Sequence, residues 1–375
     1  MRIAFTAPMK PLDDPVPSGD RTMGRLIVQA LETARHDVTV ATRFRSWKAT
    51  GGIEAQQEVE RAALAEAERV LSLWEASGYR PDIFLTYHLY HKAPDWIGPA
   101  FASRLGIPYV VIEASRAPKR KTGEWSYGFA AADAALSRAD LVAAMHRADR
   151  ECLTAVVPAE RLAVLPPFLD ADRFLQAPRI PRRDDEPVRL LAIGMMREGA
   201  KLASYRLLAE ALDRLPASLR FTLTVVGDGP CRAEVEALLA RHPVTFMGAV
   251  AGEKIPALCA SHDLFVWPAI REAFGLVFLE AQAAGLAIVG GDTFGVPDIV
   301  AHGKTGLLSA EGDAEAFARS LEALVSAPLR AAEMGSAARV HIRGRHTLAS
   351  GAASLDALLE QALRNFALRA TASQQ

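Results

Sequence analysis

The segment from Phe265 to Ala281 holds the side chains best placed to do chemistry. Two glutamates, Glu272 and Glu280, stand eight residues apart on either side of Gly275. Glycine lets a ligand approach the backbone, and free N–H groups at a helix start favour an anion such as a diphosphate. Glu280, one to two turns into that helix, can accept hydrogen bonds from sugar or ribose hydroxyls. The alternative is that Glu272 only complements the helix dipole and Glu280 lies on a solvated face.

Two of the remaining polar residues have a spacing that suggests a metal site. His88 and His91 have a His-x-x-His spacing, but they lack the neighbouring glutamate of a zincin and a clear third ligand. We therefore expect the two histidines to line a cleft or serve structure, and we predict no metal and no cofactor.

A basic stretch over residues 116–121 is the main charged feature, and it stands next to Trp125 and Tyr127. It could bind an anionic acceptor or a lipid surface, since each Lys or Arg near an anionic membrane adds about 1 kcal/mol. The alternative is a solvated loop.

Short β-like runs alternate with longer amphipathic stretches, which is typical of parallel sheets with crossover helices. The strands predicted in the first half cover residues 2–6, 37–41, 82–86, 109–112, 141–143 and 162–165. Those predicted in the second half cover residues 189–193, 221–226, 244–246, 264–267, 287–289 and 306–308. Between these halves, residues 166–187 hold five prolines and a charge run, so we place the domain boundary there. Each candidate site then follows the carboxyl end of a strand, where ligands bind in open parallel sheets.

Length and composition limit the classes of protein to which the chain can belong. The chain has 375 residues, of which 50% are hydrophobic, and a formal net charge of -1. This length fits two domains, and the charge gives no bulk attraction to nucleic acid. Three isolated cysteines fit a reducing compartment. The apolar runs are too short for a signal peptide or a membrane span, so we expect a cytoplasmic protein and leave open a peripheral position at the inner face of the membrane.

The stretch around the two glutamates resembles the Glu-x7-Glu motif of the retaining GT-B glycosyltransferases, in particular family 4. The likeness includes Phe-Gly after the first Glu and Glu-Ala at the second, and it continues through residues 284–289, 295–300 and 303–308. Asp298 stands where the family more often has Glu. Upstream, residues 225–230 and 244–248 look like the family's nucleotide-binding strands, and residues 165–170 resemble its crossover between domains.

This resemblance implies a role for each donor-side residue. Glu280 would bind the donor ribose, and Glu272 would lie beside the transferred sugar. The diphosphate would meet the helix start at Phe274, Gly275 and Leu276. Family members also bring an Arg and a Lys to the diphosphate from the loop after the first strand of the second domain, where this sequence offers Arg197 and Lys201 at altered spacing.

Two residues of the first half take their expected roles from the same resemblance. Gly19, in the loop over residues 15–21, stands where the family has a Gly-rich loop near the donor phosphate and the acceptor. The alternative is a surface loop with Ser18 or Asp20 as a helix cap. Glu113 stands where many family members carry His, so it would lie opposite Glu272 and orient or deprotonate an acceptor hydroxyl. Alternatively, Glu113 pairs with the basic residues of the 116–121 stretch.

The resemblance therefore implies two Rossmann-like doubly wound domains facing a cleft. We predict an acceptor-side domain over residues 1–170, a nucleotide-sugar-binding domain over 171–345, and a C-terminal helix over 346–375 that packs on the body. The implied activity is metal-independent transfer of a sugar from a UDP- or GDP-linked donor to a carbohydrate or lipid-linked acceptor, with retention, in surface polysaccharide or glycolipid synthesis. An epimerase, a phosphorylase or a non-catalytic nucleotide-sugar-binding protein on the same fold stays open.

Overall fold

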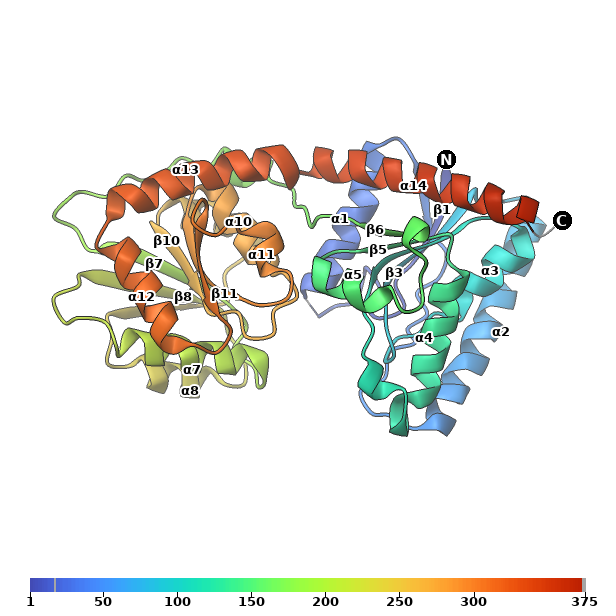
Figure 1. Cartoon of the computed structure of the whole chain (residues 1–375), viewed down its shortest axis with the longest axis horizontal. Helices are drawn as coiled ribbons and strands as arrows, with labels where there is room; N and C mark the ends of the chain where they lie inside the picture. Colours follow the sequence, from blue (N-terminus) through green and yellow to red (C-terminus); the bar gives the residue numbers. More distant parts are fainter. Residues whose placement is uncertain (17, 373–375) are drawn as a thin grey trace. The chain divides into compact units, whose positions relative to one another are not determined.

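The computed structural model describes residues 1–16 and 18–372; Pro17 of the predicted 15–21 loop and residues 373–375 of the predicted C-terminal helix lie outside the described residues. The chain forms two compact α/β units (Figure 1). The first unit comprises Met1–Pro166 together with the segment from Leu348 onward, and the second comprises Pro167–Thr347. Each unit contains one six-stranded parallel sheet, so the predicted fold class is confirmed.

The sheet of the first unit has the strand order β2-β1-β3-β4-β5-β6. Its strands are β1 (Arg2–Thr6), β2 (Asp37–Val40), β3 (Ile83–Leu89), β4 (Tyr109–Ala114), β5 (Leu141–Ala144) and β6 (Leu162–Val164). The order reverses direction between β1 and β3, and ligands of such sheets bind at the carboxyl ends of the strands at that switch point. The helices of this unit are α1 (Gly19–Thr33), α2 (Ile53–Ser77), α3 (Ile97–Leu105), α4 (Ser126–Arg138), α5 (Arg147–Leu153) and α14 (Leu348–Ala372), with single 3₁₀ turns at Pro118–Arg120, Gly123–Trp125 and Ala159–Arg161.

The sheet of the second unit has the order β12-β11-β10-β7-β8-β9. Its strands are β7 (Val188–Ile193), β8 (Phe221–Val226), β9 (Val244–Gly248), β10 (Leu264–Trp267), β11 (Ala287–Asp292) and β12 (Gly306–Ala310). Counted from β7, this is the Rossmann order 3-2-1-4-5-6, whose switch point lies between β7 and β10. The helices are α6 (Asp172–Leu175), α7 (Ala200–Leu212), α8 (Arg232–Leu239), α9 (Ile255–Ala260), α10 (Leu276–Ala284), α11 (Val296–Ile299), α12 (Ala314–Val325) and α13 (Pro328–Arg345), with a 3₁₀ turn at Gly252–Lys254.

Local sequence explains why the central strands form where they do. All four residues of β10 are buried, as are all six of β4, because helices cover both faces of a parallel sheet. Such strands read as continuous apolar runs, which is how the sequence predicted them. Apolar residues in the middle of each sheet therefore fix the strands, and the polar residues that follow them emerge at the sheet edge.

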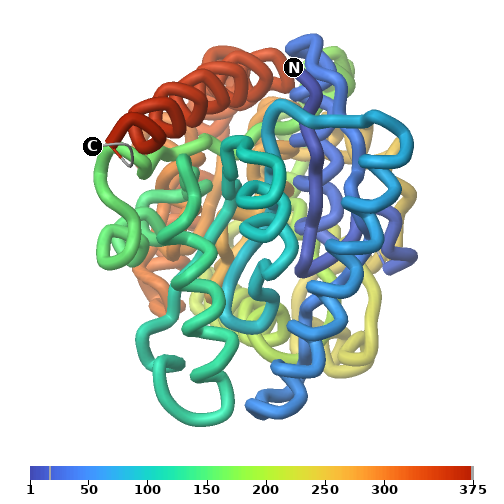
Figure 2. The backbone as a smooth tube through the Cα atoms, turned by 90° about the vertical axis from the view of Figure 1, so that its right-hand side faces the viewer, coloured from blue at the N-terminus to red at the C-terminus, as the bar shows by residue number. Residues whose placement is uncertain are grey.

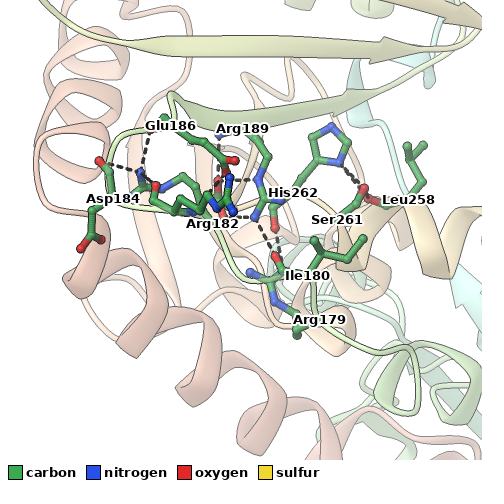
Figure 3. Close-up of polar contacts among 11 residues, drawn as sticks. Arg179, Ile180, Arg182, Asp184, Glu186, Arg189, Leu258, Ser261 and His262 are labelled. Atoms are coloured by element: carbon green, nitrogen blue, oxygen red, sulfur yellow. Dashed lines mark hydrogen bonds and ion pairs between the residues drawn. The ribbon is translucent and has the colours of Figure 1, made fainter.

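The proline-rich segment before β7 belongs to the second unit and is fastened to it by polar contacts (Figure 3). Arg189 makes a two-pronged contact with Asp263 and also donates to the backbone oxygen of Ile180, at 2.8 Å. Arg182 donates to the backbone oxygens of Arg183 and Glu186. The charge run in the segment of the predicted domain boundary is thus tied into a turn beside the sheet.

The last helix, α14, returns to the first unit. The Nε2 atom of His36 lies 3.1 Å from Asp356 Oδ1, and Gln361 donates to the backbone oxygen of Glu160 at 2.9 Å. Figures 1 and 2 both show the red C-terminal segment beside the blue and green parts of this unit. Within residues 1–16 and 18–372, a search of the helices for one long and apolar enough to cross a bilayer finds none.

Candidate functional site

The loop after β10 is shaped by residues in the left-handed region of backbone conformation. Ala269 and Arg271 have φ values of 58° and 49°, and Gly275, which precedes α10, has a φ of 70°. A Cβ atom at Gly275 would lie 3.0 Å from the Phe278 ring and 3.1 Å from Cγ of Glu272. Non-glycine residues in this region cost free energy and concentrate at functional sites. The loop therefore turns tightly and aims the start of α10 at the carboxyl edge of the sheet.

Glu272 and Lys201 form an ion pair across the switch point. Lys201 Nζ donates to Glu272 Oε2, although Lys201 lies in the first turn of α7 and Glu272 in the loop after β10. The ammonium also lies 5.4 Å from the centre of the Trp267 ring, and the indole N–H is 3.4 Å from the same carboxylate oxygen. The side chains of Lys201 and Glu272 are each 18% exposed. The pair is therefore partly desolvated and strongly oriented.

Glu280 lies on the second turn of α10 with a partly exposed side chain. Burial raises the pKa of its carboxyl to about 7, although the positive charge of Arg173 acts in the opposite direction. In the described part of the chain, its carboxylate has neither a hydrogen-bond donor nor an ion-pair partner. The Glu280 side chain is partly exposed, so the alternative of a residue on a solvated face stays open.

The strands beside this site end in glycines that allow close backbone packing. A Cβ atom at Gly227 would lie 1.9 Å from the backbone oxygen of Gly194, and one at Gly229 would lie 2.4 Å from that of Met196. The loops after β7 and β8 therefore touch backbone to backbone. Arg197 lies in the first of these loops with an exposed side chain, and its predicted contact with a diphosphate stays a prediction.

Three further residues predicted to bind the donor lie at the start of α10. Phe274 is 7% exposed, whereas Gly275 and Leu276 are partly exposed at the N-terminal end of this helix. In the first unit, Gly19 is the first residue of α1, and its missing Cβ faces open space. Ser18 caps α1 by accepting a hydrogen bond from the N–H of Arg21 at 3.2 Å, so the predicted cap exists. Contact of these residues with donor phosphates stays a prediction.

A second polar cluster lies at the switch point of the first unit. His88 Nδ1 is 3.0 Å from Asp20 Oδ1 and 3.9 Å from Glu113 Oε1. His88 and Glu113 end neighbouring strands with φ values of 61° and 57°. The alternative that Glu113 pairs with Arg116 is wrong, because Arg116 makes a two-pronged contact with Asp133 at 2.9 Å.

The charges of this cluster depend on one another. Burial disfavours a charged His88 ring, but the carboxylates of Glu113 and Asp20 outweigh burial and raise its pKa to about 9. Burial raises the pKa of Glu113, and the charge on His88 opposes that rise. Burial also opposes ionisation of Asp20, yet its bond to His88 holds its pKa below the usual value.

The two histidines of the His-x-x-His spacing separate in the structure. His91 leaves the cluster and packs against Trp125, with ring centres 5.5 Å apart, and burial followed by the charges of Arg120 and Lys92 lowers its pKa to about 4. The sequence reasoning found no third ligand for His88, but the fold brings Asp20, His88 and Glu113 together, with one potential metal-ligating atom from each within 4.8 Å of the others. The three residues are far apart in the chain. The sequence signal that could have grouped these three residues is that each one follows a predicted strand of the same sheet.

Comparisons with known proteins agree with this geometry. Residues 187–327 match the family described as "Glycosyl transferases group 1". The chain is 35% identical over 167 residues to sulfoquinovosyl transferase SQD2 of Arabidopsis thaliana, which covers 44% of this chain and 32% of that protein. It is 31% identical over 221 residues to a GDP-mannose-dependent alpha-(1-6)-phosphatidylinositol monomannoside mannosyltransferase of Mycolicibacterium smegmatis, covering 54% and 57%. The chain thus spans between a third and somewhat over half of the length of these relatives.

A solved structure of Anabaena Alr3699/HepE in complex with UDP superposes with a TM-score of 0.73 at 18% identity, covering 96% of this chain and all of the other. At this identity the likeness establishes the fold. The region matched by the family model contains Lys201, Glu272 and Glu280, so it includes the whole polar site of the second unit. Residues 187–327 are therefore homologous to the group 1 glycosyltransferases, and the two parallel-sheet units have the GT-B fold.

Proposed function

We propose that the protein is a retaining glycosyltransferase of family 4 that transfers a sugar from a UDP- or GDP-linked donor to an acceptor hydroxyl. The observation that carries the proposal is Glu280. The surroundings of this partly exposed carboxylate disfavour its charged form, and a ligand that donates hydrogen bonds to it would offset that cost. Ribose hydroxyls are donors of the required kind, and the adjacent helix start suits a diphosphate.

The ion pair at the switch point supports the sugar-transfer step. The bond between the anomeric carbon and the diphosphate oxygen breaks while a bond to the acceptor oxygen forms. The diphosphate leaves with the electron pair, and the acceptor hydroxyl gives up its proton. Preorganised positive groups at the developing charge lower the barrier. Lys201 is held by Glu272 and Trp267, so its ammonium is oriented before the donor binds. We assign Lys201 and Arg197 to the diphosphate and Glu272 to the transferred sugar.

We propose that the donor diphosphate is held without a metal or another cofactor, since cationic side chains and helix amides supply the positive charge. Glu113 is the acceptor-side residue of the first unit.

The named relatives include one with a phosphatidylinositol-linked acceptor, which supports a carbohydrate or lipid-linked acceptor here, in surface polysaccharide or glycolipid synthesis. The location at the cytoplasmic face of a membrane stays a prediction.

A thermal-shift screen against UDP, GDP and their common sugar conjugates tests the donor, because a ligand raises the melting temperature by mass action. NMR analysis of the product formed with the best donor then gives its anomeric configuration. Retained configuration in an acceptor-linked product supports the proposal, and inverted configuration contradicts it. Formation of a new nucleotide sugar without acceptor identifies an epimerase, a requirement for phosphate identifies a phosphorylase, and binding without turnover identifies a non-catalytic protein.

A further inference from the structure

The backbone on either side of Glu272 is anchored to two other elements of the second unit. The N–H of Ile270 donates to the hydroxyl of Ser204 on α7 at 3.0 Å, and this serine is 1% exposed. The N–H of Gly295, in the loop after β11, donates to the backbone oxygen of Ala273 at 2.6 Å. These contacts fix the loop two residues before and one residue after Glu272.

Glu311 supplies a third anchor from two strands away. It directly follows β12, and β11 lies between β12 and β10 in the sheet. Its Oε1 atom accepts a hydrogen bond from the N–H of Arg271 at 3.0 Å, and its Oε2 atom accepts one from the hydroxyl of Thr293 at 2.8 Å. Thr293 is itself 3% exposed. One carboxylate therefore ties the loop after β10 to the loop after β11.

The anchored loop has a backbone conformation that needs support from its neighbours. Ala269 and Arg271 both have φ values in the left-handed region, where non-glycine residues persist only if the surrounding structure imposes it. At Arg271, the residue directly before Glu272, Glu311 provides the acceptor for the backbone N–H. Loss of that acceptor would let Arg271 relax, and its relaxation would turn the backbone that carries Glu272.

We propose that Glu311 is a positioning residue for sugar transfer, which keeps Glu272 at the transferred sugar by holding the loop after β10. This inference rests on the role assigned to Glu272 in the proposed function. Lys201 orients the Glu272 side chain, whereas Glu311 fixes the backbone from which that side chain extends. Both oxygens of Glu311 are engaged by donors of the protein, so the carboxylate acts through the loop.

Initial rates of sugar transfer and calorimetry with free nucleotide test this role. A misplacement of about 1 Å can cost roughly 10²-fold in rate, so we expect Glu311→Ala to lower kcat by about 10–100-fold. Its affinity for free nucleotide should stay close to that of the wild type, because the hydrogen bond between Gly295 and Ala273 still holds the segment before α10.

A conservative variant and a matched control separate geometry from charge and from stability. Glu311→Gln should keep most of the wild-type rate, because its amide oxygen can accept the N–H of Arg271 and its amino group can donate to the Thr293 hydroxyl. The control is Glu315→Ala, which removes an exposed glutamate in the first turn of α12 and should match the wild type. Melting temperatures of all variants show whether the rates are measured on folded protein.

A double-mutant cycle tests whether the two contacts of Glu311 act as one anchor. Thr293→Val removes the hydroxyl and keeps the side-chain shape, so it should lower kcat in the same direction but by less than Glu311→Ala. The double variant should be no slower than Glu311→Ala alone, because both changes act through one carboxylate. Two fully additive losses would contradict a shared anchor.

Trp267 reports the position of Glu272 without any substrate, since its indole N–H lies 3.4 Å from Glu272 Oε2. The chain contains five tryptophans, so protein labelled with fluorotryptophan should give five fluorine NMR resonances, and Trp267→Phe assigns that of Trp267. Glu311→Ala should shift or broaden this resonance. Glu311→Gln and Glu315→Ala should leave it in place.

Several outcomes would overturn the inference. One is a wild-type rate in Glu311→Ala, with or without a lower melting temperature, because Glu311 would then serve stability alone. Another is an unmoved Trp267 resonance in that variant. A third is a Glu311→Gln variant as slow as Glu311→Ala, since the charge rather than the hydrogen bonds would then matter. If the wild type transfers no sugar while the Trp267 resonance responds as expected, the proposed function fails and the loop anchor stands.

Discussion

Replacing Glu280 with glutamine should stabilise the protein without ligand and weaken nucleotide binding. Burial raises the pKa of this carboxyl from 4.5 to about 7. The folded protein thus favours the protonated form, so the contribution to stability is complete below pH 4.5 and is lost as the pH rises through 7. Glutamine keeps the shape of the protonated form and carries no charge, so it avoids that loss.

The size of the effect follows from the same shift. One pKa unit corresponds to about 1.36 kcal/mol, so a shift of about 2.5 units costs the ionised wild type up to about 3 kcal/mol at pH 8. At pH 5 the folded carboxyl is protonated and the unfolded one only partly ionised, so the cost is about 1 kcal/mol. Urea unfolding of both proteins at the two pH values measures the difference. For the second unit alone, about 3 kcal/mol corresponds to a rise in melting temperature of roughly 6–12 °C.

The affinity of Glu280→Gln for nucleotide should fall, although its stability without ligand rises. Losing a charge-assisted hydrogen bond costs roughly 1–3 kcal/mol, and calorimetry with free UDP and GDP measures it. The matched control is Glu333→Gln, an exposed glutamate on α13 of the same unit, which should change neither quantity. Equal stability of wild type and Glu280→Gln at pH 8 would refute the argument from burial. Unchanged nucleotide affinity would refute the assignment to ribose.

Three further predictions concern the same unit. Glu272→Gln should lower the sugar-transfer rate more than it changes the affinity for free nucleotide, because Glu272 faces the sugar while Lys201, which it holds, keeps its own charge for the diphosphate; initial rates and calorimetry separate the two effects. Gly275→Ala should lower the melting temperature, because it forces a Cβ into a left-handed backbone against Phe278, by an amount in the range of about 1–3 kcal/mol. Nucleotide affinity should persist in excess EDTA, and a loss of binding that Mn²⁺ or Mg²⁺ restores would contradict the metal-free donor site.

The sequence by itself determined the features that depend on short-range spacing. Buried strands of parallel sheets appear as continuous apolar runs, so the strand positions in both halves could be predicted. The spacing of Glu272, Gly275 and Glu280 is set by one loop and one helix, so it could also be predicted from the sequence. Each of these features requires only a few consecutive residues, because local backbone geometry sets their separation.

Only the tertiary structure decided which distant side chains meet and which are buried. Strand β10 lies beside β7 although β8 and β9 intervene in the chain, and this order brings Lys201 to Glu272. Residues from α1, β3 and β4 make the Asp20 cluster in the same way. The sequence predicted only that the C-terminal helix packs on the body, and its contacts with His36 and Glu160 place it on the first unit. Strand order and burial depend on contacts between residues far apart in the chain, which periodicity and spacing do not encode.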